Sequence, residues 1–120
     1  MNLSDTAIRE VPASEQAARI LIVDDDPVIR AVLREVLLNR GYSVDEMASA
    51  TDVRQSMHTS RWDLILLDRR LPDCDGLVLL KTIQKTLPCP VIILSILGDD
   101  HDRVLGLEMG AADYLAKPVN

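Results

Sequence analysis

Short apolar runs alternate with longer amphipathic segments along the chain, and this alternation predicts an α/β domain. Five runs have the length and β-branched content of strands, and we expect strands at residues 20–23, 42–46, 64–68, 91–94 and 114–116. Strands that alternate with helical patterns are typical of βα units in a parallel sheet. The first and fourth runs are apolar throughout, so helices must cover both faces of that sheet. The pattern therefore predicts a doubly wound parallel sheet.

Four segments between these runs are expected to be helices. The first is the best marked, because Asp26 is suited to cap it, Pro27 to occupy its first turn and Gly41 to end it. Its apolar residues at helical spacing are Ile29, Val32, Leu33, Val36 and Leu37. The other helices are expected at about residues 51–57, 76–86 and 102–109, and the segment LPDCDG is expected to be the turn that leads into the helix at 76.

Composition and charge exclude several classes of protein. Hydrophobic residues make up 48% and charged residues 27% of the 120 residues, which are ordinary values for one globular domain. No apolar run approaches the roughly 20 residues that span a bilayer, and the start of the chain lacks the pattern of a signal peptide, so we expect a cytoplasmic protein. Residues 1–18 show no sustained period and are expected to be a flexible leader before a domain at 19–120.

The net charge is -6 and no basic run is present, which argues against direct contact with nucleic acid. Cys74 and Cys89 are too few and too widely spaced for a disulfide scaffold or a CxxC site. We expect both to be reduced thiols.

Polar residues follow the strands that reach the centre of the expected sheet. Asp24 and Asp25 follow the first strand, Asp68 ends the third, Ser95 follows the fourth and Lys117 follows the fifth. Ligands of open parallel sheets bind beyond the carboxyl ends of the strands. Each residue alone has an ordinary explanation as a loop acid, a turn former or a surface charge, but their joint placement at one edge indicates a site.

The residue types in this group indicate phosphoryl transfer. Carboxylates from two adjacent strands repel one another unless a cation lies among them, and an all-oxygen ligand set with room for a phosphate suits Mg²⁺. A lysine and a hydroxyl can hold the oxygens of a phosphoryl group as charge develops on it.

The sequence resembles the receiver domain of two-component response regulators over about residues 19–118. The matching segments are ILIVDDD, DLILLDRRLPDCDG, VIILS and GAADYLAKP, in this order. The segment DRVLGLEMGAADYLAKP is most similar to the OmpR-like, winged-helix subfamily. The resemblance implies a flavodoxin-like, five-stranded sheet of order 2-1-3-4-5. It also implies a phosphoacceptor that assists its own phosphorylation and dephosphorylation, not a conventional enzyme.

The resemblance also assigns expected roles to the acidic residues. Asp68 would be the phosphoacceptor, taking a phosphoryl group from a histidine on a sensor histidine kinase. Asp24, Asp25 and Asp68 would bind Mg²⁺ together with the backbone carbonyl of Arg70. The output domain, absent from residues 1–120, would be a DNA-binding one that regulates transcription.

The remaining family positions would contact the phosphoryl group or respond to it. Ser95 would move toward a phosphoryl oxygen, Lys117 would pair with the group, and Tyr114 would turn inward as a readout. Ile96 stands where receivers carry a small residue, and we expect it to slow phosphotransfer or hydrolysis. Arg69 and Arg70 are expected to be solvated charges, with the alternative that Arg70 pairs with the phosphoryl group and shields it.

Receivers carry a fifth helix after the fifth strand, whereas this sequence stops at Asn120. We therefore expect a receiver truncated after strand five, a fragment of a longer regulator that compensates by self-association. Two alternatives remain open. One is a receiver-like interaction module that works without phosphorylation, and the other is a small phosphatase or nucleotide-binding protein. The latter is disfavoured because the sequence lacks a GxGxxG or P-loop and has Arg70 where a second acid is required.

Overall fold

A computed structural model describes residues 17–96 and 100–117, although the side chains of residues 96 and 100–102 are not described. Five parallel strands form one sheet of order β2-β1-β3-β4-β5. The strands are β1 (Arg19–Val23), β2 (Ser43–Met47), β3 (Leu64–Asp68), β4 (Val91–Ile96) and β5 (Asp113–Lys117). The helices are α2 (Pro27–Asn39), α3 (Ala50–Ser56), α4 (Gly76–Thr86) and α5 (Asp100–Glu108). The expected elements and strand order are confirmed, with ends that differ by at most two residues. The expected leader lies almost wholly outside the described residues.

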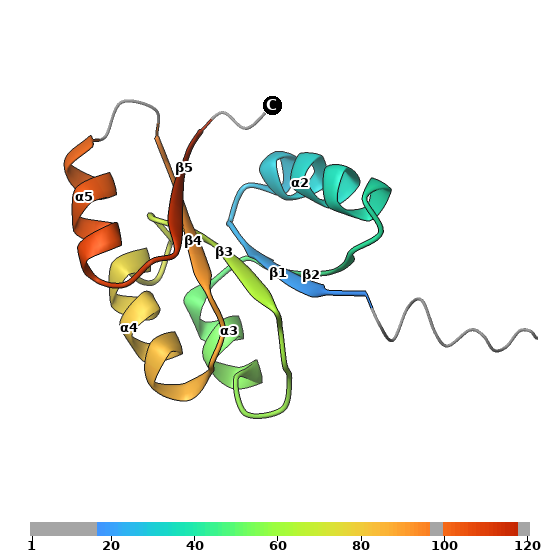
Figure 1. The fold of residues 1–120 in the computed structure, drawn as a ribbon, viewed down its shortest axis with the longest axis horizontal. Coiled ribbons are helices and arrows are strands. Elements are labelled where there is room, and N and C mark those ends of the chain that lie inside the picture. The colour runs from blue at the N-terminus through green and yellow to red at the C-terminus, as the bar shows by residue number, and fades with distance from the viewer. Residues whose placement is uncertain (1–16, 97–99, 118–120) are drawn as a thin grey trace, which may run out of the picture.

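Helices lie on both faces of the sheet, with α2 on one face and α3, α4 and α5 on the other (Figure 1). The larger core lies beneath the group of three and contains Leu21, Val53, Leu67, Leu80 and Ile93 among its fully buried side chains. A smaller core lies beneath α2, where Leu33 packs against side chains of β1, β3 and β4. Because alternate residues of a strand point to opposite faces, β1 supplies both cores. This explains its unbroken apolar sequence.

The boundaries of α2 follow the expected local signals. Asp26 caps the helix by accepting a hydrogen bond from the backbone N–H of Val28, and Pro27 occupies the first turn. Gly41, just beyond the helix, has φ of 90°, a conformation that glycine adopts without steric cost. The prediction that one apolar stripe of α2 faces the sheet was wrong in part. Leu33 is buried, whereas Val32 and Val36 are exposed to solvent.

On the face that carries α2, an apolar side chain of the edge strand is open to solvent. Tyr114 belongs to the opposite core, so Leu115, the next residue of β5, points to the α2 face, where it is 39% exposed. Among the described residues, α2 is the only helix on that face. No helix in the described part of the chain is long and apolar enough to cross a membrane.

Candidate functional site

The strand register aligns the expected site residues at one edge of the sheet. Val23 in β1 is paired with Leu67 in β3, so Asp24 and Asp68 leave neighbouring strands at the same level. Asp68 is in turn paired with Leu94, the residue before Ser95. Lys117 is paired with Ile96 at the end of β4. The register therefore brings together side chains separated by up to 93 residues (117 minus 24).

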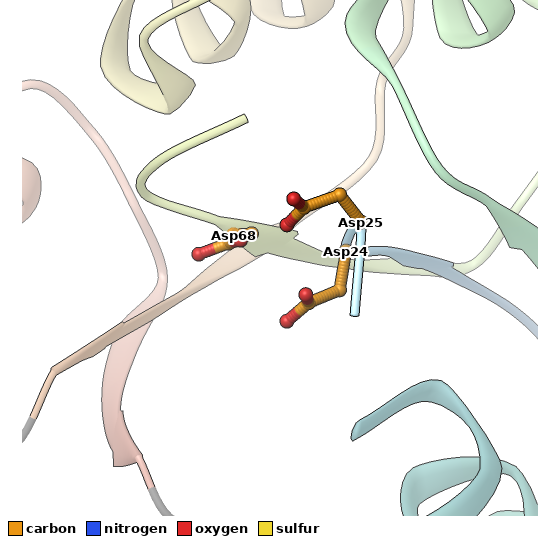
Figure 2. A group of neighbouring side chains, drawn as sticks. All are labelled: Asp24, Asp25 and Asp68. Carbon is orange, nitrogen blue, oxygen red and sulfur yellow. The ribbon is translucent and has the colours of Figure 1, made fainter. Parts of the chain in front are cut away.

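Asp24, Asp25 and Asp68 form a carboxylate cluster. One oxygen from each lies within 4.8 Å of the others, and Figure 2 shows the three groups turned to the same side of the strand ends. Asp24 is fully buried and Asp68 nearly so, whereas Asp25 is exposed. Three oxygen ligands around a shared space, with one open side, fit a hard divalent ion such as Mg²⁺ that keeps part of its water shell. The three carboxylates expected to be metal ligands are therefore adjacent in space.

Lys117 joins the two buried carboxylates. Its Nζ lies 2.8 Å from Oδ2 of Asp24 and 3.1 Å from Oδ1 of Asp68. Burial alone would lower the pKa of Lys117, but the hydrogen bonds and charge interactions with Asp24 and Asp68 outweigh it and raise the pKa above its usual value. The ammonium therefore remains charged and balances part of the negative charge of the cluster.

The surroundings of Asp68 raise the pKa of its carboxyl group above the usual value. Burial is the largest influence that raises its pKa, and repulsion from Asp24 adds to it. A 3.2 Å hydrogen bond from the backbone N–H of Arg70 and the contacts with Lys117 act in the opposite direction without cancelling the rise. A cation bound among the carboxylates would favour ionisation, so the site has an electrostatic reason to bind one.

A pocket of about 270 Å³ opens above Asp68. Its lining residues are Asp25, Asp26, Asp68, Arg69, Arg70, Ser95 and Lys117. The Ser95 hydroxyl is buried and has no hydrogen-bond partner among the described residues. Because buried hydroxyls are normally paired, this oxygen is suited to contact an oxygen of a bound group. The pocket thus contains an acid, a cation and an unpaired hydroxyl.

The loop after Asp68 is shaped by a close approach of the chain to itself. A Cβ on Gly76, the first residue of α4, would collide with the carbonyl oxygen of Asp68, so only glycine fits there. The N–H of Gly76 donates to the carbonyl of Arg69, and Asp75 caps α4. Asp73 holds the loop from the other side by accepting hydrogen bonds from the backbone of Ala50 and from the backbone and hydroxyl of Thr51.

Two expectations for the arginines have different outcomes. Arg70 is exposed, as expected, and lines the pocket. The expectation of a solvated Arg69 was wrong, because its side chain is only 12% exposed and forms an ion pair with Asp75. The turn from β3 into α4 brings these two residues together across six positions of sequence. Sequence spacing alone gives no sign of that turn geometry.

Arg30 is a supporting residue that the sequence did not single out. Its guanidinium donates to the carbonyl oxygen of Asp24 at 2.7 Å and to the carboxylate of Glu46 at 3.1 Å. Arg30 therefore connects the loop that begins at Asp24 to α2, which contains the arginine, and to β2, which contains Glu46. In the sequence, only the position of Arg30 in the first turn of α2, close to Asp24, indicated that it could support the site.

Tyr114 and Ile96 complete the set of expected positions. Tyr114 is 9% exposed and packs in the core shared with α4 and α5, so its ring points inward. The backbone of Ile96 ends β4 beside Lys117, but its side chain lies outside the described residues.

Comparisons with known proteins agree on one family. The profile of the response regulator receiver domain family matches residues 20–120. The TorCAD operon transcriptional regulatory protein TorR of Escherichia coli is 41% identical over 100 residues, which cover 83% of this chain and 44% of TorR. The transcriptional regulatory protein GltR of Pseudomonas aeruginosa is 42% identical over 108 residues, which cover 88% of this chain and 45% of GltR. The chain thus spans under half the length of the curated relatives it matches.

A solved structure gives the same result at the level of the fold. The receiver domain of the TMAO respiratory system response regulator TorR superposes with a TM-score of 0.79 at 40% sequence identity. The match covers 86% of both chains.

Proposed function

The chain belongs to the response regulator receiver domain family, and from this premise we propose that it accepts a phosphoryl group on Asp68 in a Mg²⁺-dependent reaction. The observation that carries the proposal is the position of Asp68. Its carboxylate shares one space with Asp24 and Asp25, lies 3.1 Å from Nζ of Lys117, and lines a pocket with the unpaired hydroxyl of Ser95.

In the proposed reaction, an oxygen of Asp68 attacks the phosphorus of a phosphodonor. The bond from phosphorus to the donor breaks and its electron pair leaves with the donor, so that an acyl phosphate forms on Asp68. Lys117 and Ser95 hold the phosphoryl oxygens, which supports the transfer by positioning and by neutralising charge. Asp24, Asp25, Asp68 and the carbonyl of Arg70 would hold Mg²⁺, which would supply further positive charge to the site.

The proposed switch connects this chemistry to Tyr114. A phosphoryl group draws Ser95 toward itself, and the space that the hydroxyl leaves favours the inward position of the tyrosine ring. Arg70, exposed at the rim of the pocket, is proposed to pair with the phosphoryl group and slow its hydrolysis, and Ile96 to modulate the same rate. A local change of charge thereby biases a two-state surface.

The proposal extends to the partners. The phosphodonor is a phosphohistidine on a sensor histidine kinase. Since TorR and GltR are transcriptional regulatory proteins, a DNA-binding output domain in a longer protein would respond to the switch. Self-association through the face that exposes Leu115 is also part of the proposal, because burial of that apolar surface stabilises an assembly.

Labelling with a small phosphodonor tests the proposal. The folded chain is incubated with acetyl phosphate and Mg²⁺, and intact mass spectrometry is expected to detect one added phosphoryl group. The label should be absent after Asp68→Ala and after removal of Mg²⁺ with a chelator. Asp52→Ala, which removes an acid of α3 outside the pocket, should be labelled like the wild type. A folded wild-type chain that acquires no label would contradict the acceptor role and favour an interaction module.

A further inference from the structure

A second groove lies on the helical side of the sheet, between α4 and α5. These helices lie side by side (Figure 1), and the groove has a volume of about 540 Å³. On the α5 side it is lined by Leu105 and by Met109, which directly follows the helix, and both side chains are half-buried. On α4 the apolar contribution comes from Leu77, which is buried, and from Val78, which is 53% exposed. The groove therefore has apolar walls that solvent reaches.

The α4 side of this groove is positively charged. Lys81 and Lys85 follow Val78 at spacings of three and seven residues, so all three lie on one stripe of the helix. In the part of the chain that the structure describes, neither lysine has an ion-pair partner. The whole chain carries a net charge of -6, so a stripe of unpaired cations beside apolar walls contrasts with the rest of the molecule.

The groove also shares a wall with the pocket above Asp68. Arg69 lines both spaces, and its ion-pair partner Asp75, the cap of α4, lines the groove. The side chain of Arg69 is 12% exposed, so it is fixed between the two spaces. An occupant of the groove would therefore lie one side chain away from the proposed phosphorylation site.

We propose that the groove between α4 and α5 is a docking site for an acidic, amphipathic segment of a partner protein. Apolar side chains of that segment would fill the space between Val78, Leu105 and Met109, as amphipathic segments do in grooves between helices. Its carboxylates would pair with Lys81 and Lys85, and this pairing would set orientation and selectivity. The inference goes beyond phosphoryl transfer and does not require it.

A pair of synthetic peptides tests the inference on the unphosphorylated chain. Both peptides are fluorescein-labelled and carry leucine at the same helical spacing. One has glutamate and the other glutamine at the remaining positions. Fluorescence anisotropy is expected to show saturable binding of the glutamate peptide and weaker binding of the glutamine peptide, and added salt should weaken only the former. Amide chemical shifts are expected to change in α4 and α5.

Charge-reversed variants make the test specific. Lys81→Glu/Lys85→Glu should weaken binding of the glutamate peptide by about tenfold or more. The control Arg40→Glu/Arg61→Glu changes the net charge equally at exposed positions that have no ion pair in the described residues, and it should bind like the wild type. Circular dichroism verifies that each variant is folded, which is expected because all four residues are exposed.

Three results would overturn the inference. One is absence of binding at about 1 mM glutamate peptide, because a dissociation constant above this concentration is too weak for specific docking. Another is equal binding by both double variants. The third is binding of the chain to vesicles of phosphatidylglycerol, lost in the Lys81→Glu/Lys85→Glu variant, without binding of the peptide, which would identify an anionic lipid surface as the occupant. None of these binding experiments uses acetyl phosphate. A negative result in them is therefore distinct from a failure of Asp68 to be phosphorylated.

Discussion

Gly106 in α5 lies against the aromatic ring of Tyr114 in β5. A Cβ atom on Gly106 would be 3.4 Å from Cδ2 of Tyr114 and 3.7 Å from Cγ1 of Ile93. Because residue 106 has no side chain, the ring of Tyr114 can pack directly against the backbone of α5. A side chain larger than alanine at residue 106 would therefore compete with the Tyr114 ring for this space.

Gly106→Val is expected to displace the Tyr114 ring. The γ-methyl groups would overlap the ring, and such overpacking should lower the free energy of unfolding by about 1–3 kcal/mol. Gly106→Ala is the matched control, because its Cβ makes an ordinary contact and alanine favours the helix. Urea denaturation measures the stability, and ring resonances report the position of Tyr114. Equal stability and equal ring shifts in both variants would contradict the steric argument.

Asp68→Asn is expected to stabilise the metal-free chain at neutral pH. Burial, and then repulsion from Asp24, raises the pKa of Asp68 above the unfolded value of 3.8, so between these two pKa values the folded state binds more protons than the unfolded state. The free energy of unfolding of the wild type relative to Asp68→Asn should therefore fall as pH rises through that window. Chemical denaturation at a series of pH values measures this difference, and a difference independent of pH would contradict the argument.

Mg²⁺ is expected to reverse this disadvantage of the wild type. An ion that binds only the folded chain adds about 2.7 kcal/mol to the free energy of unfolding at 100 times its dissociation constant. The gain should be largest in the wild type and reduced in Asp25→Asn, which loses one ligand. A chelator should abolish it. Thermal melting with and without Mg²⁺ measures the effect, and equal gains in both proteins would show that the ion binds elsewhere.

Lys117→Met is expected to slow labelling by acetyl phosphate about 100-fold, since a group that neutralises charge on the phosphoryl oxygens contributes on this scale. The variant also leaves Asp24 and Asp68 without their shared ammonium, so the pKa of Asp68 should rise further. A time course of intact mass at saturating Mg²⁺ measures the rate. Lys117→Arg keeps the charge and should retain part of it; equal rates in all three proteins would exclude a role for the ammonium.

Asp73→Ala is expected to destabilise the chain with a characteristic pH dependence. The Thr51 hydroxyl first, and then the backbone N–H groups of Ala50 and Thr51, lower the pKa of Asp73 to about 2. The stabilisation by Asp73 should therefore be complete above the unfolded pKa of 3.8 and should disappear as pH falls through about 2. Denaturation curves of wild type and variant should differ at pH 7 and converge near pH 2. Thr51→Val, which removes one of the three bonds, should show a smaller difference of the same form.

The sequence predicted the elements well because strands and helices of a doubly wound sheet carry strong local signals. The apolar run at Ile20–Val23 and the cap and proline at the start of α2 determine these elements with little help from the rest of the chain. The rule that ligands bind beyond the carboxyl ends of parallel strands was sufficient to group four residues, because these ends lie at one edge of the sheet. The four residues are Asp24, Asp68, Ser95 and Lys117.

The sequence did not predict contacts that depend on how loops fold. The pairing of Arg69 with Asp75, and the bonds from Asp73 to residues more than twenty positions earlier, follow from the path of the loop between β3 and α4. That path depends in turn on the approach of Gly76 to the carbonyl of Asp68. The basic groove was missed for a similar reason, since it forms only where α4 and α5 lie together.

The place of Lys117 in the sheet has a mechanical consequence. Among the described residues β5 is an edge strand, hydrogen-bonded within the sheet to β4 alone, and Lys117 is its last residue. Separation of β5 from β4 would move the ammonium group of Lys117 away from the site. The buried carboxylates of Asp24 and Asp68 would then lack their positively charged partner. This electrostatic penalty opposes fraying of β5, so the lysine that we propose holds the phosphoryl group also stabilises the strand that carries it.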